Sequence, residues 1–230
     1  MHFSTPASLS LAAALLISQP TASAGQADTP EINEAQRLVF MNDYLDDIGA
    51  GSVLSYGFSH RGRESKGFSD TVKVTVTDVL EGGKHNLSFD FLTGDNHIDF
   101  HPAAGYKGNP VAIQFLERDI QEMAKSTDGH AGYFQNRIRK SFVHPEIREV
   151  KIPYQGKEVD GVKISVTPFV NDPNIDRFKA YAGKRYEFLF SDQIPGGLYE
   201  IHTLVPGQDG GDPLVEEGLT FRQLTSVGTQ

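Results

Sequence analysis

Residues 97–101, with the sequence HIDFH, contain side chains that commonly bind metals. His97, Asp99 and His101 alternate with Ile98 and Phe100, and this alternation predicts a strand with one polar and one apolar face. Residues two apart on a strand have Cα atoms about 6.6 Å apart, so Asp99 could share an ion with either histidine. The two histidines lie about 13 Å apart, near the limit at which both reach one metal. A complete site would therefore need ligands from other segments.

Three further histidines could supply those ligands, namely His60, His85 and His130. The pairing order of the strands would decide whether any of them comes close. The alternative interpretation is a solvated strand face that happens to carry two imidazoles. Because alternation with apolar residues already accounts for the segment, the solvated face is the simpler explanation.

A charged residue stands within an apolar helix face further along the chain. The pattern predicts a helix over residues 110–127, with Asn109 as cap and Pro110 in its first position. Its apolar residues cover one continuous arc, and Asp119 projects into that arc. An unpaired buried carboxylate is strongly unfavourable, so we expect Asp119 to have a partner.

Arg137 and Arg139 are the expected partners, because residues 133–142 are predicted to form a strand that folds back against the helix. An ion pair from Asp119 to one of them would fix the helix against the sheet. In a second interpretation, the arginines line a cavity where the anionic group of a ligand competes with Asp119. A third interpretation gives Asp119 a catalytic role.

Aromatic residues gather on one predicted sheet face. Tyr186, Phe188 and Phe190 stand at every second position of one predicted strand, and later strands add Tyr199, Ile201 and Phe221. Core packing explains such a face, but in a sheet open on one side it would line an apolar ligand groove. The candidate ligand-binding residues are therefore Asp119, Arg137, Arg139, Tyr186, Phe188 and Tyr199.

The elements that must position these residues follow from the apolar periodicity. A helix is predicted over residues 29–48, with Thr29 as its cap, and an antiparallel meander over residues 54–58, 72–76, 87–91 and 98–100. After the long helix come a hairpin with Val162, Ile164 and Val166 inward, and a short helix from Asp172. A second hairpin turns at residues 195–197, and a last strand covers residues 219–225.

The predicted fold class is α+β. A single domain would hold a curled antiparallel sheet of roughly eight to ten strands, half-barrel-like, wrapped around one long helix and joined by an N-terminal helix. This order of elements is similar to that of the half-barrel carriers of the bacterial envelope, such as those that ferry lipoproteins. The resemblance covers the order of the elements.

Residues 1–24 have the pattern of an export signal. An apolar run over residues 9–17 is followed by Pro20 and by Ala22-Ser23-Ala24, a small-x-small sequence that a signal peptidase accepts. The run is shorter than the roughly 20 residues of a membrane span. We therefore expect cleavage near Ala24 and a periplasmic or secreted mature chain, residues 25–230, formed as one domain. Without cysteine it can form no disulfide.

Composition and motifs narrow the function. The formal net charge of −9 disfavours nucleic acid as a partner. No local signature of a serine hydrolase, zinc protease or nucleotide-binding loop occurs. The leading hypothesis is an exported, soluble, non-enzymatic binding or carrier protein for an apolar or amphipathic small molecule or lipid. The alternatives are a metal-binding envelope protein using His97, Asp99 and His101, a structural or interaction module, and an enzyme without a local signature. Apart from that metal, no cofactor is indicated.

Overall fold

The structure is a computed structural model, and it describes residues 32–63, 65–207 and 211–226. The predicted export signal and Thr29 lie outside these ranges. From Ile32 onward the chain forms one compact unit. Among the residues described, no helix has the length and hydropathy needed to cross a membrane.

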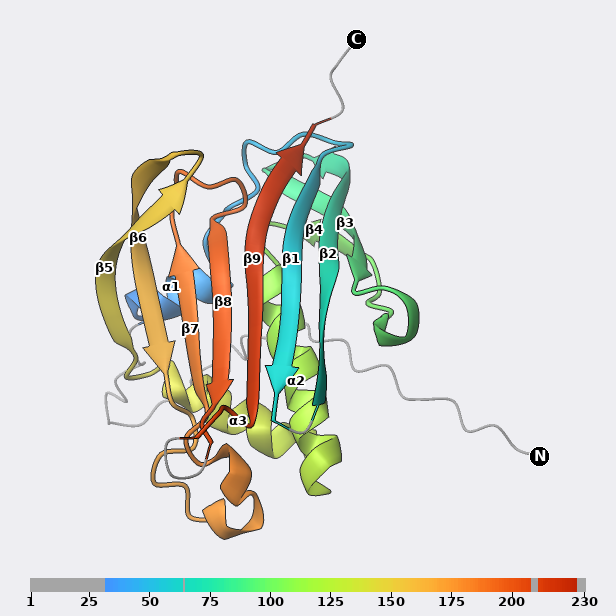
Figure 1. Cartoon of the computed structure of the whole chain (residues 1–230). Helices are drawn as coiled ribbons and strands as arrows, with labels where there is room; N and C mark the ends of the chain where they lie inside the picture. Colours follow the sequence, from blue (N-terminus) through green and yellow to red (C-terminus); the bar gives the residue numbers. More distant parts are fainter. Residues whose placement is uncertain (1–31, 64, 208–210, 227–230) are drawn as a thin grey trace, which may run out of the picture. The chain divides into compact units, whose positions relative to one another are not determined.

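Nine strands form one antiparallel sheet in the order β4-β3-β2-β1-β9-β8-β7-β6-β5 (Figure 1). The predicted α+β fold class, with its curled sheet, is confirmed. The last strand, β9, lies between β1 and β8 and joins two meanders. The strands are β1 (Val53–Gly62), β2 (Ser65–Leu80), β3 (Lys84–Phe91), β4 (Ala103–Tyr106), β5 (Glu146–Tyr154), β6 (Lys157–Val166), β7 (Arg185–Phe190), β8 (Leu198–Val205) and β9 (Val215–Thr225).

The sheet is strongly curled. In Figure 1 the helices lie behind the strands, so the sheet has an inner face toward the helices and an outer face toward the viewer. β5 and β9 are four positions apart in the sheet, which corresponds to about 19 Å in a flat one. Yet the ring centroids of Tyr154 and Phe221 are only 6.2 Å apart. This contact requires the β5 end of the sheet to bend back toward its middle.

The long helix α2 (Val111–Thr127) ends where predicted and begins one residue later than predicted. Pro110 occupies the cap position, and the side chain of Asn109 accepts a hydrogen bond from the Val111 amide at 3.0 Å. The same buried side chain donates to the Tyr56 hydroxyl and to the Gly196 carbonyl. Asn109 therefore attaches the start of the helix to β1 and to the turn before β8.

The N-terminal helix is shorter than predicted. α1 covers Glu34–Phe40 and begins at Asn33, whose side chain forms a reciprocal capping box with Gln36. Leu45 and Ile48 are buried as expected, but they lie in turns after the helix. The helical spacing of these apolar residues therefore predicted correctly that they are buried, but not the secondary structure of the segment.

The prediction of a strand over residues 133–142 is wrong, because α3 (Ala131–Ser141) is a helix. Phe134 and Ile138 are its buried residues, and Phe142 is buried directly after it. A spacing of four puts residues on one face of a helix or of a strand, but a strand would add Asn136 and Lys140 to that face, so the polar residues at those positions favour the helix.

Residues 97–101 do not form the predicted strand. A short 3₁₀ turn, η1 (Gly94–Asn96), precedes them, and Ile98 makes a single bridge to Phe91. Phe100 packs edge-on against Phe91, so its burial comes from a loop that folds over β3. The fourth strand of the meander is instead β4, a few residues later.

The second half of the chain matches its predicted hairpins, β5–β6 and β7–β8. Ile164 and Val166 are buried and Val162 is half-buried, and β9 is longer than predicted. The short helix expected from Asp172 is replaced by two 3₁₀ turns, η2 (Ile175–Arg177) and η3 (Lys179–Tyr181).

Candidate functional site

Polar side chains form a row across the middle of the inner face. Tyr186 on β7 stands beside Thr203 on β8, which stands beside Glu217 on β9, and Glu217 stands beside His60 on β1. Paired residues in antiparallel strands share a face, so all four side chains face the helices. We call these four residues the inner polar row. An ordinary core would hold apolar residues here.

The first charged cluster joins α2 to the β7 end of the row. Nζ of Lys184 lies 2.7 Å from Oδ1 of Asp119, and the Tyr186 hydroxyl donates to Oδ2 of the same carboxylate. The side chain of Lys184 is 1% exposed and that of Asp119 is 5% exposed. The ammonium also lies 5.2 Å from the centre of the Tyr186 ring. Asp119 thus has the partners that its burial requires, namely Tyr186 on β7 and Lys184 directly before this strand.

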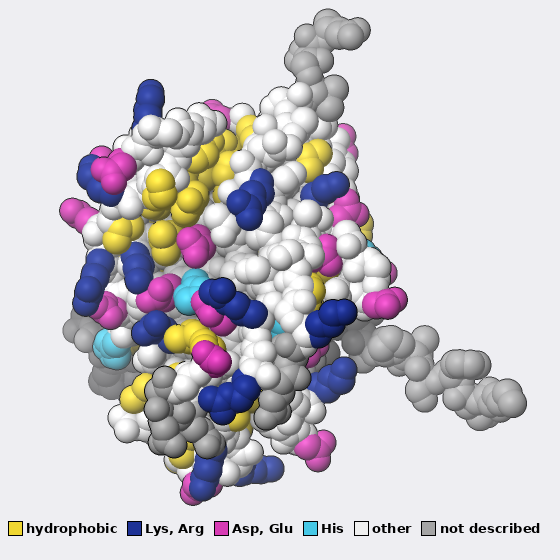
Figure 2. Space-filling view, viewed as in Figure 1, with side chains coloured by type: hydrophobic (Ala, Val, Ile, Leu, Met, Phe, Trp, Pro, Cys, Tyr) yellow, Lys and Arg dark blue, Asp and Glu magenta, His cyan; other side chains and the backbone are white. Residues whose placement is uncertain are grey.

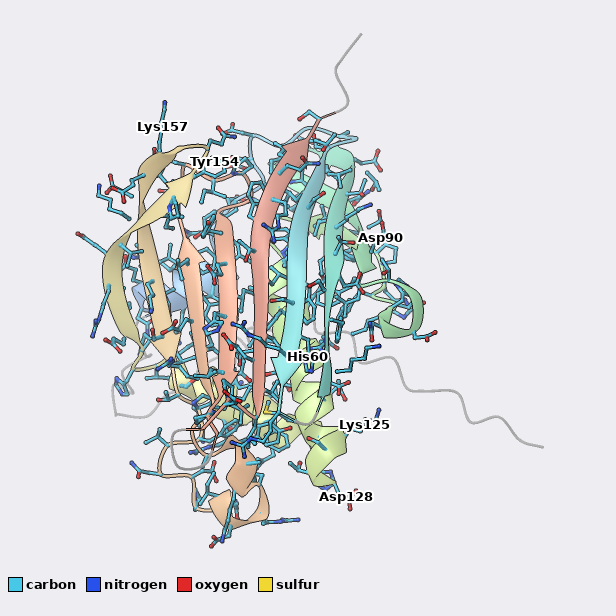
Figure 3. The ribbon with its side chains drawn as sticks, viewed as in Figure 1. His60, Asp90, Lys125, Asp128, Tyr154 and Lys157 are labelled. Atoms are coloured by element: carbon cyan, nitrogen blue, oxygen red, sulfur yellow. The ribbon has the colours of Figure 1, made fainter. Side chains whose placement is uncertain are left out.

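The second charged cluster joins α2 to the middle of the sheet. Nη1 of Arg118 donates to both carboxylate oxygens of Glu217 at 2.9 Å, and Nδ1 of His60 lies 2.7 Å from Oε1. The Arg118 guanidinium also lies over the Phe58 ring, 5.0 Å from its centre. Figure 3 shows His60 at the lower end of β1, where α2 passes behind the sheet. Both clusters therefore cross the same helix–sheet interface.

The charges around Glu217 keep its carboxylate ionised at neutral pH. Burial alone would raise the pKa of Glu217, but the hydrogen bond with His60 and the charges of Arg118 and Lys184 hold it below its usual range. Burial, together with the neighbouring Asp119 charge, raises the pKa of the Tyr186 hydroxyl well above its ordinary value. Tyr186 therefore stays a hydrogen-bond donor at neutral pH.

Aromatic side chains surround the inner polar row. Tyr186 and Phe188 are fully buried on β7, with rings stacked at 6.4 Å, and Phe188 also contacts Phe142 after α3. Phe115 of α2 packs against Phe58 of β1. Tyr199 is half-buried, at an irregularity in the β7–β8 pairing. The predicted aromatic face exists and lies under the helices.

The expected ion pair between Asp119 and Arg137 or Arg139 is not formed. Because their segment is a helix, Arg139 is exposed, and Nε of Arg137 lies 2.5 Å from Oδ2 of Asp172. Asp172 is buried and also accepts a hydrogen bond from Tyr133. Arg137 thus serves the contact between α3 and the loop after β6. The part of both arginines in ligand binding stays a prediction.

His97, Asp99 and His101 are exposed in the loop before β4. His85 is fully buried on β3, His130 caps α3, and His60 belongs to the inner polar row. Within the described part of the chain, no three His, Asp or Glu side chains are grouped so that they could hold a metal ion. The interpretation of residues 97–101 as metal ligands stays a prediction.

Four members of the two charged clusters were not identified from the sequence. These are Arg118, Lys184, Glu217 and His60, and His60 had been considered only as a metal ligand. Glu217 carried a usable signal, since it precedes Leu219 and Phe221 at the spacing of one strand face. Glu217 interrupts an apolar strand face in the same way that Asp119 interrupts an apolar helix face. Lys184 directly precedes β7 and gave no such pattern.

Two solved structures are similar to this chain. The lipoprotein LppX of Mycobacterium tuberculosis has 10% sequence identity and a TM-score of 0.36, and the match covers 86% of this chain and 99% of that one. A LolA superfamily protein of Nitrosomonas europaea has 10% identity and a TM-score of 0.26, with 85% and 94% covered. No protein-family model and no curated protein sequence matches the chain.

Proposed function

We propose that the mature chain is an exported, non-enzymatic binding or carrier protein, and that an apolar or amphipathic ligand binds between the inner face of the sheet and α2. One observation carries the proposal. Two buried ion pairs, Asp119–Lys184 and Arg118–Glu217, join α2 to an inner face whose other buried side chains are mostly aromatic and aliphatic.

The ion pairs are poorly explained by stability alone. Replacing a buried ion pair by well-packed apolar residues is often neutral or stabilising, because removing two charges from water offsets their attraction. The same charges lower the free energy needed to separate the two layers, since water solvates all four groups once they part. An interface built this way suits a helix that must leave the sheet to admit a ligand.

The proposed ligand site has two parts. The apolar part of the ligand would lie against the inner-face rings that include Tyr186 and Phe188, and its polar end would lie at the charged clusters. Lys184 and Asp119 are almost completely buried, so a bound molecule reaches them only when α2 moves. Export rests on the sequence of residues 1–24 and belongs to the proposal.

The first experiment is native mass spectrometry of the mature chain purified from the compartment to which it is exported, with small molecules and metals measured in the same preparation. We expect a copurified amphiphile at close to one per chain, and saturable binding of a fluorescent fatty acid after its removal. A preparation with neither a copurified molecule nor saturable binding would rule the function out.

A second experiment tests the opening of the interface. The triple variant Asp119→Leu, Lys184→Met and Tyr186→Phe replaces the first cluster by apolar side chains without leaving a buried partner unpaired. We expect it to remain folded and to exchange a bound fatty acid at least tenfold more slowly than the wild type. The matched control replaces the exposed pair Lys151–Asp160 by Met and Leu, and its exchange rate should not change.

A further inference from the structure

The outer face of the sheet carries a polar groove of about 410 Å³, lined by side chains of β1, β6, β7, β8 and β9. Figure 2 shows acidic and basic side chains side by side around a histidine near the middle of this face. The groove is separate from the proposed ligand site, because the sheet lies between them.

Most charges of the groove are already paired. Glu187 accepts a hydrogen bond from Lys163, with the atoms 2.9 Å apart. Glu216 accepts hydrogen bonds from Arg61, at 2.8 and 2.9 Å, and contacts His202 at 2.8 Å. These pairs use both fixed cations of the lining, Lys163 and Arg61.

Glu200 is the third carboxylate of the groove, and it belongs to none of these pairs. It is half-buried on β8, and among the described residues it has no hydrogen-bond or ion-pair partner. With the cations matched to Glu187 and Glu216, Glu200 gives the lining an excess of one negative charge. A half-buried carboxylate without a partner favours a cationic group beside it.

The neighbours of Glu200 define the kind of cation. Leu189 on β7 and Thr220 on β9 stand directly opposite it, one apolar and one with a hydroxyl. Gly218 adds no side chain to the lining and lies against Ser59, since a Cβ atom there would be 3.0 Å from Oγ of Ser59, and the groove has a volume of about 410 Å³. The site thus has room for a short chain, an apolar wall, and hydrogen-bond acceptors at one end. Since no three ligating side chains are grouped in the described chain, an organic cation fits it better than a metal ion.

We propose that this groove binds an alkylammonium group, with Glu200 accepting hydrogen bonds from the ammonium and Leu189 contacting the alkyl chain. The proposal does not depend on the ligand of the inner face. Free amines and lysine side chains of a peptide both carry this group, so the experiment uses one probe of each kind.

The test is a titration of the folded mature chain, followed by backbone amide NMR shifts, with putrescine and separately with acetyl-Gly-Lys-Gly-amide. We expect saturable shifts of residues on β7, β8 and β9 for at least one probe, and Glu200→Gln should weaken that binding at least tenfold. Binding of putrescine alone assigns the groove to free amines, and binding of the peptide assigns it to lysine side chains. Gly218→Val adds a side chain to the groove and leaves its charge unchanged, so it should weaken binding by steric exclusion.

The matched control is Asp90→Asn, which removes one negative charge from exposed Asp90 on β3, four positions from β8 in the sheet. In Figure 3 Asp90 lies at the right-hand edge of the sheet, and β2, β1 and β9 separate its strand from β8. The proposal is overturned if neither probe saturates, if Glu200→Gln binds like the wild type, or if Asp90→Asn weakens binding as much. The last result would mean general attraction of amines to a chain of net charge −9.

Discussion

Asp119 lies where α2 otherwise presents apolar side chains, and its carboxylate is bound by Lys184 and Tyr186. Replacement by asparagine keeps the shape and removes the charge, which leaves the Lys184 ammonium buried without a counter-ion. We expect Asp119→Asn to lower the free energy of unfolding by about 3–5 kcal/mol. Urea unfolding followed by circular dichroism measures this.

The control for Asp119 is Asp160→Asn, which breaks an exposed pair with Lys151 and should leave the urea midpoint unchanged. Equal midpoints for wild type and Asp119→Asn would show that the buried pair contributes no net stability. That outcome would also weaken the case for charges that ease the opening of the interface.

Glu216 on the outer face gives a prediction about pH. Hydrogen bonds from Arg61, with further help from His202, lower the pKa of Glu216 from 4.5 to about 2 against an opposing effect of burial. A carboxylate whose folded pKa is depressed stabilises the fold above its unfolded pKa, and this contribution is lost as pH falls toward the folded pKa. We therefore expect the stability advantage of wild type over Glu216→Gln to shrink between pH 4.5 and pH 2.

Urea midpoints of both proteins measured from pH 7 to pH 2 test this. The change should be small, because the Arg61 side chain is exposed and solvent screens its charge. Curves that stay parallel below pH 4.5 would contradict the assigned role of Arg61.

At the scale of elements, α2 depends on Asn109 for its attachment to the sheet. The side chain makes three hydrogen bonds, to Val111, Tyr56 and Gly196. Asn109→Ala should lower the free energy of unfolding by about 3 kcal/mol, at about 1 kcal/mol for each bond. Asn96→Ala, at an exposed position in η1, is the control and should unfold like the wild type.

Elements with a clean repeat were predictable from sequence, and those held by tertiary contacts were not. β1 alternates over residues 54–58 and β2 over residues 72–76, and α2 has a capping residue as well as a periodic face, so local patterns specify these segments. Residues 97–101 alternate equally well, but they make a single bridge to β3, from Ile98 to Phe91, and the ladder to β3 is formed by β4 at His85 and Leu87. Sequence alternation reports burial on one side and does not report a pairing partner.

The candidate site was predictable only in part for a similar reason. Asp119 was found because one charge interrupts an apolar arc, which a single element reveals. Its partner, Lys184, comes from 65 residues away in the chain. Which segment supplies a partner depends on strand order, and strand order was not readable from local patterns.

At the scale of the whole molecule, β9 completes the sheet. It pairs with β1 on one side and β8 on the other, so without it the two meanders share no strand pairing. A chain ending at residue 214 should therefore show no cooperative unfolding transition. A chain ending at residue 226, just after β9, should unfold like the full chain.

Circular dichroism during urea titration distinguishes these outcomes, and a synthetic peptide of residues 214–226 should restore the transition to the shorter chain. A cooperative transition in the shorter chain alone would mean that one meander folds with the helices by itself.

The central position of β9 also sets when the protein can fold. Val53 of β1 pairs with Thr225 of β9, so one edge of β1 has no partner until nearly the whole chain is available. At about 5–20 residues per second of synthesis, that edge stays unpaired for on the order of ten seconds. An unpaired strand edge can join another chain during that interval. Newly made copies therefore gain from a holding chaperone, or from being kept unfolded until the last strand has been delivered.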